Sequence, residues 1–592
     1  MANISKLRRE DLLEKISQIR KFIENSKADK NTHNLLQYLN EIAKDVKGKK
    51  YGLVFEEHRE AIDEILEKNL PVLTEDESLE INNGGEQNFL IEGDNLASLK
   101  LLEKTHRGKI DVIYIDPPYN TGNKVNQDFF YDDHFVDEND TFRHSKWCSF
   151  MEKRLEIARK LLSEKGVIFI SIDDHEQATL KMLCDRIFGE KNSVAEFIWE
   201  KTQHFGRQAK NYYSNCEYVL CYSKNLYSNE KLNELLVEKF NDDLQDAPLY
   251  NASNPEKTLT FPSGSVKFNI ADGKYEASSD EKYIMCNAVN VVNGLNENEL
   301  ILKFRSRWSA KTVIEEYEKG CRFWVKSKNF AIRAIYQEDK ISITSPKQII
   351  FTNLNNPFCA SNRIGDKVGT TETGTDDLEK IIGPSSFKYP KPTSLISYLL
   401  GMIYEEEIGK FSTSSTILDF FAGSGTTGHA VLKLNESDGG HRKFILCTNN
   451  QNNICRDITY QRLKTVITGK RKDGSVYGDS HPASLKYFRI DYVPISEKLY
   501  YEYADELLKH VRELVELENG IDFSKNKEIA IILTDEEMER FVESNKSKKS
   551  LGITKVYYGH NVLLSNHQMN FMKKHNIKLN VIPDYYYQEL EK

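Results

Sequence analysis

Runs of continuous apolar residues alternate with amphipathic stretches between residues 87 and 173 of this 592-residue chain. The runs NFLIEGDN, DVIYIDPPY and VIFISID predict strands, and the stretches between them have the apolar spacing of helices. Strands without polar alternation are typical of a parallel sheet covered on both faces. Because ligands of such sheets bind at the carboxyl ends of the strands, we expect a binding edge at the acids that end these runs, Asp94, Asp116 and Asp173.

The same rhythm returns near residue 385, after a stretch of different composition. STILDFF, HAVLKLN and KFILCTN predict strand, helix and strand, whereas the preceding stretch is richer in Asn, Lys, Ser and aromatic residues. We therefore expect an α/β domain split by an insertion. The predicted units are an N-terminal helical region (1–70), a first α/β half (71–200), the insertion (201–380), a second α/β half (381–484) and a small C-terminal α/β module (485–592).

Composition excludes several classes of protein. With 39% hydrophobic and 29% charged residues, the chain has the balance of a globular protein rather than a disordered one. No run of about 18 apolar residues occurs, so we expect no transmembrane helix and no membrane partner. The charged N-terminus lacks the apolar core of a secretory signal. Nine scattered cysteines without a C-x-x-C pair favour a reducing, cytoplasmic location over disulfides or a zinc ribbon.

The tetrapeptide Asp116-Pro117-Pro118-Tyr119 follows an apolar run. Pro118 has no N–H, so this turn has one fewer donor for nearby carbonyl groups. An acid and a carbonyl side by side can accept both hydrogens of an exocyclic amine, and Tyr119 offers a flat face on which a base can stack. A rigid strand-to-loop turn without a ligand has the same residues, so the tetrapeptide alone leaves both interpretations open.

The run LDFFAGSGTTG lies between a predicted strand and a predicted helix, where glycines let the backbone approach a ligand closely. Gly423 and Gly428 have P-loop spacing, but His429 and Ala430 stand where that motif needs Lys and Ser or Thr. With Gly425 they match the dinucleotide spacing G-x-G-x-x-G, yet no acid ends the next strand. The turn can hold a nucleoside ligand without a phosphate, or no ligand at all.

Together, these two motifs resemble those of the DNA amino-methyltransferases that use S-adenosyl-L-methionine. The run from Phe421 to Gly425 is similar to their F-x-G-x-G cofactor motif. Asp-Pro-Pro-Tyr is similar to the catalytic motif of the N6-adenine enzymes, since N4-cytosine enzymes more often begin it with Ser. The catalytic motif comes first, which is the permuted order of the β class. Further runs, IEGDNL, FKYPKP and VIPDYY, resemble the Mod subunits of type III restriction–modification systems.

This resemblance implies a fold, an activity and partners. The fold would be a circularly permuted, Rossmann-like methyltransferase sheet with an inserted target-recognition domain. The activity would be methyl transfer from S-adenosyl-L-methionine to adenine N6 in double-stranded DNA, with flipping of the target base. The resemblance also implies a Mod homodimer and a separate Res subunit with helicase and nuclease activity. This chain has no Walker A motif, so any ATP-driven translocation would come from a partner. No metal is implied, and the sequence shows no metal-binding cluster.

The resemblance also implies roles for individual residues. Asp116 and the Pro117 carbonyl would hold the adenine amine, and Tyr119 would stack on the flipped base. Lys391 would contact the cofactor carboxylate, and Asp94 would accept from the cofactor's adenine amine. Asn449 stands near the place where many methyltransferases have an acid for the ribose. The remaining cofactor-binding candidates are Asn95, Asp419, Phe421, Ala422, Gly423, Gly425 and Thr426.

Residues 303–333 carry nine Lys or Arg against three Glu, with aromatic residues between them. In a chain of net charge −9, this segment predicts a local duplex-binding surface, although a solvated strand–helix pair has the same pattern. A weaker basic cluster follows the first α/β half. The DNA-binding candidates are Lys201, Arg207, Lys303, Arg305, Arg307, Lys311, Arg322 and Lys326.

Two other functions stay open from the sequence. One is an N4-cytosine methyltransferase, which Asp116 disfavours. The other is a DNA-specificity subunit with vestigial catalysis, which the intact Asp116, Tyr119, Gly423 and Gly425 disfavour. The helices expected in residues 1–70 also have two interpretations, a packed hairpin or a dimerisation surface.

Overall fold

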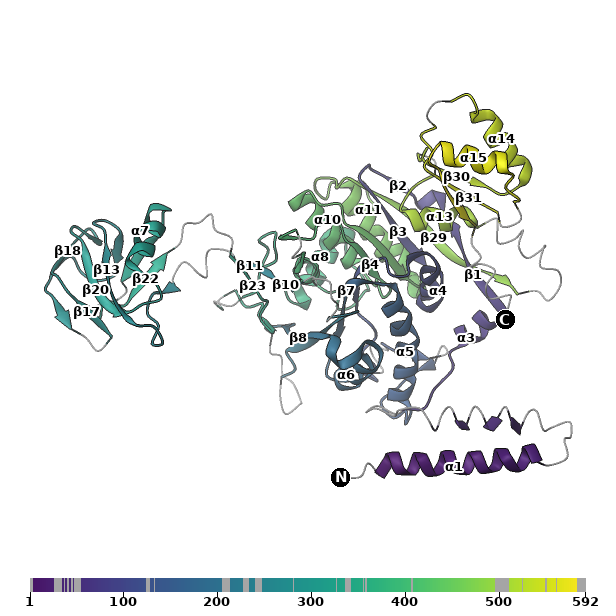
Figure 1. Cartoon of the computed structure of the whole chain (residues 1–592), viewed down its shortest axis with the longest axis horizontal. Coiled ribbons are helices and arrows are strands. Elements are labelled where there is room, and N and C mark those ends of the chain that lie inside the picture. The colour runs from purple at the N-terminus through teal and green to yellow at the C-terminus, as the bar shows by residue number, and fades with distance from the viewer. Residues whose placement is uncertain are drawn as a thin grey trace.

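A computed structural model gives the fold (Figure 1). It describes residues 4–25, single positions between 35 and 46, and residues 55–123, 128–131, 134–204, 213–226, 234–239, 247–279, 282–325, 327–335, 342–354, 356, 359–405, 408–495, 510–523, 525–548, 551–559 and 562–582.

One large sheet forms the centre of the molecule. Its strand order is β1-β29-β3-β28-β27-β4-β7-β9-β8-β24, with β2 added to β29. The six strands from β29 to β7 run parallel, and β1 and β9 flank them in the antiparallel direction. The α/β class predicted from the alternating pattern is therefore confirmed. The strand bounds are β1 Asn69–Glu75, β2 Ile81–Asn82, β3 Glu86–Glu92, β4 Ile110–Ile115, β7 Leu162–Ile172, β8 Ser193–Glu200, β9 Cys216–Ser223, β24 Ile349–Ile350, β27 Thr416–Asp419, β28 Lys443–Thr448 and β29 Ala483–Pro494.

Helices cover both faces of the sheet (Figure 1). Successive strand residues point to opposite faces, so Phe89 and Ile91 enter one core and Leu90 enters the other. Helices α4 (Asn95–His106), α5 (Arg143–Leu161) and α6 (Gln177–Cys184) pack in the first core. Helices α8 (Thr371–Ile382), α9 (Thr393–Leu400), α10 (Thr426–Asp438) and α11 (Tyr460–Thr468) pack in the second. Burial on both faces explains why the strands read as continuous apolar runs.

The chain enters the sheet out of sequence order. Strands β27 and β28 come from the second α/β half, yet they lie between β3 and β4 of the first half. This arrangement brings the strand before the Gly-rich turn directly beside the strand before Asp116.

The sheet also takes in segments beyond the expected boundaries of its two halves. Strand β9 and the short β24 belong to it, although both lie within the expected insertion at 201–380. Strand β29 runs across the expected boundary at residue 484, so the C-terminal segment begins inside the sheet. Strand β1 contains Pro71, where we expected the N-terminal helices simply to end. Proline has no N–H for a ladder, and it is tolerated here because β1 is the edge strand.

Residues 247–335 form a separate β-rich body beside the sheet (Figure 1). A seven-stranded sheet, β12-β22-β21-β14-β19-β18-β15, and a four-stranded sheet, β13-β20-β17-β16, enclose one hydrophobic core together with helix α7. The bounds are β12 Ala247–Pro248, β13 Glu256–Phe261, β14 Val266–Phe268, β15 Gly273–Tyr275, β16 Ser278–Ser279, β17 Tyr283–Met285, β18 Val289–Val292, β19 Leu295–Asn296, β20 Leu300–Arg305, α7 Ala310–Glu318, β21 Arg322–Val325 and β22 Ile332–Ile335.

Short strand pairs lie outside these two bodies. Strand β5 (Phe130–Tyr131) pairs with β6 (His134–Phe135), and β11 (Val237–Lys239) pairs with β23 (Ser342–Thr344). Strand β25 (Ile403–Glu405) pairs on its two sides with β10 (Glu234–Leu235) and β26 (Lys410–Phe411).

The C-terminal residues form a small α/β module. Strands β30 (Ile529–Ile532), β31 (Lys555–Tyr558) and β32 (Lys578–Val581) are parallel, and helices α14 (Asp535–Asn545) and α15 (Asn566–Lys574) share their core. Helix α13 (Val511–Asn519) instead packs in a core of the main sheet.

At the N-terminal side, the structure describes helices α1 (Ile4–Asn25) and α3 (Ala61–Lys68). No helix in the described part of the chain combines the length and hydropathy that a bilayer-spanning segment requires.

Candidate active site

Four neighbouring strands of the main sheet end in candidate site residues. In sheet order, β3 leads to Asp94, β28 to Asn449, β27 to Asp419 and β4 to Asp116. These strands are parallel, so their carboxyl ends form one edge. Residues predicted from motifs more than 300 positions apart in sequence therefore lie along one edge of the sheet.

The loop after β4 carries the Asp-Pro-Pro-Tyr sequence, residues 116–119, and is the candidate catalytic loop. The Tyr119 hydroxyl donates to Asp116 Oδ1 at 2.9 Å, which folds the ring back toward the acid. The Trp147 indole donates to the Pro118 carbonyl at 2.7 Å. The loop is thus fixed at both ends, and one of its carbonyls already has a donor.

Asn120 fixes the end of this loop. It is fully buried and has φ 55°, in the left-handed region that Asn tolerates better than most residues. Its amide donates to the buried Glu176 at 2.6 Å and to the Arg143 carbonyl at 3.2 Å. The sequence analysis missed Asn120 and Glu176, although an Asn two residues after a Pro-Pro pair is consistent with a turn that adopts such a conformation.

Lys391 comes from the turn before α9, and its side chain packs against the Asp-Pro-Pro-Tyr loop. Its ammonium donates to both Asp116 oxygens, at 2.9 and 2.8 Å, and to the Tyr119 hydroxyl at 2.8 Å. The resemblance implied instead a contact with the cofactor carboxylate. In the structure, Asp116 is the acid nearest to this buried ammonium, and a buried charge needs a partner. The contact with a cofactor stays a prediction.

Glu217 is a second acid at this site that the sequence analysis missed. It comes from β9, and its Oε2 lies 3.1 Å from the Tyr119 hydroxyl oxygen, as an alternative acceptor to Asp116 for its one proton, and 3.5 Å from the Lys391 ammonium. Lys201 donates to its other oxygen, Oε1, at 3.3 Å. The available signal was an acid inside an apolar strand, CEYVLCYS, because buried acids are rare without a partner.

Burial and charge act together on these groups. Burial raises the pKa of Asp116 above its ordinary value, and Lys391 only partly opposes this. Burial lowers the pKa of Lys391, but the nearby carboxylates of Asp116 and Glu217 outweigh it, so the pKa lies above the ordinary value. We therefore expect Lys391 to stay charged at neutral pH.

The Gly-rich turn after β27 begins at Asp419 and enters helix α10 at Thr426. Gly423 and Gly425 have φ values of 49° and 75°, a region that side chains rarely adopt. A Cβ at Gly423 would come 3.2 Å from the Phe387 ring, and one at Gly425 would come 3.3 Å from the Thr459 carbonyl. The turn therefore depends on glycine, both for its conformation and for its close neighbours.

Asp419 is buried beneath this turn. Its carboxylate accepts from the Phe421 backbone N–H at 2.9 Å and from the Thr427 hydroxyl at 2.5 Å. Burial raises its pKa to about 7, even though both hydrogen bonds favour the ionised form. Its role in the structure is to hold Phe421 and Thr427 in place.

A buried arginine, Arg462 of α11, holds the far side of the turn. Its guanidinium donates to the hydroxyls of Thr426 at 2.7 Å and Thr393 at 2.9 Å. Burial lowers its pKa to about 10. Thr459 adds a 2.6 Å hydrogen bond to the Gly423 carbonyl. The sequence analysis missed both residues because they come from a later helical segment.

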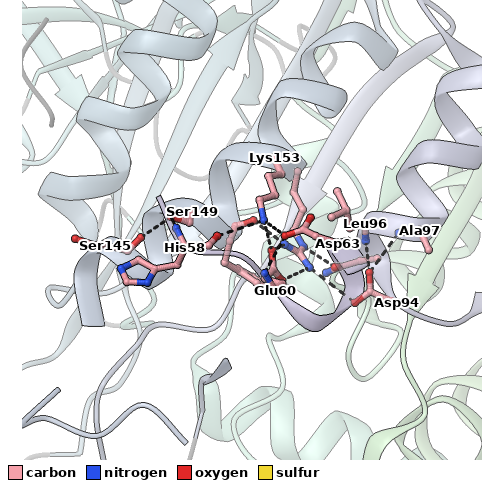
Figure 2. Close-up of polar contacts among 12 residues, drawn as sticks. His58, Glu60, Asp63, Asp94, Leu96, Ala97, Ser145, Ser149 and Lys153 are labelled. Carbon is pink, nitrogen blue, oxygen red and sulfur yellow. Dashed lines mark hydrogen bonds and ion pairs between the residues drawn. The ribbon is translucent and has the colours of Figure 1, made fainter. Parts of the chain in front are cut away.

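Asp94 and Asn95 have hydrogen-bond partners at the start of α4, and Figure 2 shows Asp94 beside Leu96 and Ala97. Asp94 Oδ1 accepts from the backbone N–H groups of Leu96 at 2.8 Å and Ala97 at 3.2 Å, so Asp94 caps the helix. Asn95 Oδ1 accepts from Arg154 at 2.6 Å. The buried Arg154 also forms a two-point ion pair with Glu60 at 2.9 and 3.0 Å, which ties the N-terminal segment to α5.

Asn449 is exposed after β28, and its side chain accepts from the Gln451 backbone N–H at 3.2 Å. Ala422 is buried.

In the described part of the chain, no group of three or more His, Cys, Asp or Glu side chains could hold a metal ion.

The basic candidates do not form one surface. Lys201 points to Glu217 at the catalytic loop. Lys303 and Arg305 are on β20 of the four-stranded sheet and Arg322 is on β21 of the seven-stranded sheet. Because both sheets turn their apolar residues into one core, these exposed cations point to different sides. Arg307 and Lys311 are exposed after β20, and Arg207 and Lys326 lie outside the described residues.

The aromatic residues between these cations also differ from the expectation. Phe304, Phe323 and Phe330 are buried in the core of the 247–335 body, so they do not belong to a DNA surface. For Phe304 and Phe323, strand alternation is the cause, since every second residue of β20 and β21 points inward. Phe330 lies in the turn between β21 and β22.

Fold and site together define an α/β protein with an acid–Pro-Pro-Tyr loop and a Gly-rich turn on adjacent parallel strands. The chain belongs to the DNA methylase family, whose N6_N4_Mtase model matches residues 110–461. That range contains the catalytic loop, the insertion and the Gly-rich turn.

Three curated relatives are similar to this chain. The StyLTI Mod subunit of a type III restriction-modification enzyme from Salmonella typhimurium is 31% identical over 412 residues, which cover 65% of this chain and 56% of that protein. The EcoPI Mod subunit from Escherichia phage P1 is 31% identical over 64% of this chain and 60% of its own length. The type II methyltransferase M.KpnI from Klebsiella pneumoniae is 32% identical over 62% and 82%. The match thus spans less than two thirds of either Mod subunit.

Proposed function

We propose that this protein is a site-specific DNA methyltransferase that transfers a methyl group from S-adenosyl-L-methionine to adenine N6 in double-stranded DNA. The observation that carries the proposal is the adjacency of β4 and β27. It brings an amine-binding loop at Asp116 beside a Gly-rich turn that suits a nucleoside-like methyl donor. Membership of the DNA methylase family supports the same reaction.

The residues around the Gly-rich turn fit such a cofactor. A Cβ at Gly423 would approach Phe387 and a Cβ at Gly425 would approach Thr459, so the turn keeps the backbone at the sheet edge free of side-chain bulk. Phe421, Ala422 and Thr426 would line this cradle, while Asp94, Asn95 and Asn449 end the neighbouring strands. The cofactor supplies a methyl group on a positively charged sulfur, which is electrophilic.

The chain's own groups prepare the amine. The lone pair of adenine N6 is delocalised into the ring, which makes it a poor nucleophile. The Asp116 carboxylate and the Pro117 carbonyl would accept the two N–H groups and localise the lone pair, since Trp147 already occupies the Pro118 carbonyl. Asp116 also stabilises the positive charge that develops on the amine. The pKa of Asp116 is raised above its ordinary value. As the pH is lowered, turnover should therefore begin to fall at a higher pH than the ordinary pKa of an Asp would give.

Access to the base requires that it leave the DNA stack. Tyr119 presents its ring beside Asp116 and would stack on the flipped adenine, with its hydroxyl held by Asp116 and Glu217. We therefore include base flipping in the proposal.

The insertion would contact the duplex through its seven-stranded sheet. Cross-strand pairing sets Trp324 between Lys267 and Arg333 on that sheet, with Arg322 two residues before Trp324. Cations around an aromatic ring on a sheet suit phosphates and bases. Arg322 and Arg305 each donate to a backbone carbonyl at 3.1 Å, so they do not distinguish the two sheets. On the four-stranded sheet, however, the charge of Lys303 is paired with Glu256 at 3.1 Å.

Two charge-matched variants test this choice of surface. We expect Lys267→Glu with Arg322→Glu to weaken duplex binding and to reduce the slope of log affinity against log salt by about 2. Lys303→Glu with Arg305→Glu changes the charge equally on the other sheet and should leave that slope nearly unchanged. The opposite ranking, measured by fluorescence anisotropy at several salt concentrations, would move the DNA surface to the four-stranded sheet.

The wider assembly is also part of the proposal. Similarity to Mod subunits supports a role as the modification and recognition subunit of a type III system, with a second copy of this chain and a Res subunit as partners. The strand order supports a circularly permuted methyltransferase fold with the insertion as target-recognition domain. The nine cysteines, none of which is in a disulfide in the structure, support a cytoplasmic location.

The experiment that tests the proposal is expression in a methylation-free bacterial host, followed by sequencing that reports modified bases in the genome. We expect N6-methyladenine at one short motif, and none with Asp116→Asn. N4-methylcytosine would instead support the cytosine alternative. An unmodified genome together with retained cofactor binding and a soluble protein would contradict the proposed activity of the chain alone.

A further inference from the structure

We propose that Glu217 is a positioning residue that takes the Lys391 ammonium away from Asp116 when the target amine enters the site. This inference rests on the methyl-transfer function proposed above. Its observation is a buried arrangement in which one lysine lies between two acids and contacts the first more closely than the second.

Asp116 is heavily occupied in the structure. Its Oδ1 accepts from Lys391 at 2.9 Å and from the Tyr119 hydroxyl at 2.9 Å, and its Oδ2 accepts from Lys391 at 2.8 Å. A carboxylate oxygen has two lone pairs, so Oδ1 has none left for the amine and Oδ2 has one left beside the Lys391 hydrogen bond. An amine that binds to Asp116 would become positive near this ammonium, and two neighbouring cations would repel each other.

Glu217 offers the ammonium a second position. Its Oε2 is 3.5 Å from Lys391 Nζ, and a shift of less than about 1 Å would give a charge-assisted hydrogen bond. The side chains of Lys391 and Glu217 are only 8% and 11% exposed, so water competes weakly for either group. The four-carbon stem of lysine allows such a movement.

Two neighbours keep Glu217 in place for this role. Lys201 donates to Oε1 at 3.3 Å, and Oε2 lies 3.1 Å from the Tyr119 hydroxyl oxygen, whose single proton can turn to it from Asp116. Two lysines therefore balance two carboxylates among these groups. When Lys391 moves to Glu217, Asp116 regains its lone pairs and its full negative charge for the amine.

Glu217→Gln tests the inference, because the amide keeps the shape and removes the charge that receives Lys391. We expect kcat to fall about tenfold with little change in the KM for S-adenosyl-L-methionine, a size typical of coupled neighbours. The charge of Glu217 also raises the pKa of Asp116, so the acidic limb of the kcat profile should shift to lower pH in this variant. Glu217→Asp should restore part of the rate.

Lys201→Met is the matched control. It removes the other cation on Glu217 but leaves the acceptor for Lys391, so kcat should change less than in Glu217→Gln. A Glu217→Gln enzyme with wild-type kcat and an unshifted acidic limb would overturn the inference. So would a kcat loss that Lys201→Met reproduces fully, because Glu217 would then serve only to anchor Lys201.

A thermal double-mutant cycle separates this inference from the proposed function. Lys391→Met, Glu217→Gln and the double variant are melted without DNA or cofactor. We expect the double variant to lose less Tm than the two single losses combined, because both remove one interaction. Additive losses would overturn the inference even in an active enzyme. If the wild type is inactive but the Tm losses are not additive, the proposed function is wrong while the interaction between Lys391 and Glu217 is supported.

Discussion

The catalytic loop at 116–119 and the Gly-rich turn at 419–426 end adjacent parallel strands, yet they are held in different ways. Charged groups hold the loop, through Lys391 on Asp116 and Glu217 on the Tyr119 hydroxyl. Backbone conformation, hydroxyl groups and the buried Arg462 hold the turn. The loop should therefore respond most to changes of charge, and the turn to changes of shape.

The largest expected effect comes from the loop. Asp116→Asn keeps the size of the side chain and removes the charge that stabilises the cationic amine. We expect kcat to fall about 10²–10³-fold in steady-state methyl transfer, the range seen when one electrostatic group of a transition state is lost. Cofactor affinity, measured by calorimetry, should stay close to wild type. Normal turnover in this variant would exclude Asp116 from the mechanism. The loop would then not depend on charge more than the Gly-rich turn does.

The second effect comes from the turn and involves no charge. Gly425→Ala forces an Ala into φ 75° and brings its Cβ 3.3 Å from the Thr459 carbonyl. The left-handed conformation costs about 1–2 kcal/mol, so we expect cofactor affinity to fall about tenfold.

Gly439→Ala is the control for this change. Gly439 has φ 65° at the other end of the same helix, and a Cβ there would meet nothing within 4 Å. It should lower Tm without changing cofactor affinity. Equal losses of affinity in both variants would mean that helix stability, rather than the shape of the turn, determines binding.

This contrast also explains which parts of the site were predictable. The Gly-rich turn could be identified because its glycines are contiguous in sequence. Partners of the loop come from far away, since Glu217 follows Tyr119 by 98 residues and Lys391 follows Asp116 by 275. Sequence motifs identified Lys391 but not Glu217. These two charges come together only because β9 packs near the 390–392 turn.

The fold shows the same division between local and distant information. Strands β3, β4 and β7 were predicted because burial on both faces makes them continuous apolar runs. Strand β1 was missed for two reasons. The Glu/Lys-rich segment before it indicated a helix, and Pro71 is unusual in a strand and is tolerated here at the sheet edge. The cations of 303–333 could be counted from the sequence, but their division between two sheets depends on tertiary packing.

The smallest expected effect tests the one acid within the turn. Asp419 has a pKa of about 7 in the folded protein, against an ordinary value of 3.8. Between these values the folded state binds more protons than the unfolded state, so this group's contribution to stability decreases as pH rises. Asp419→Asn removes that dependence while an Asn oxygen can still accept from the Phe421 N–H. The stability of the variant relative to wild type should therefore rise by on the order of 1–2 kcal/mol from about pH 5 to about pH 8.

Melting temperatures of the two proteins across that pH range measure the difference. The comparison between them cancels titrating groups that they share, such as His429, whose pKa burial lowers well below its ordinary value. If the difference in Tm does not change with pH, Asp419 is ionised in the folded protein as readily as in the unfolded chain. The turn would then hold a full buried charge, and it would resemble the catalytic loop rather than contrast with it.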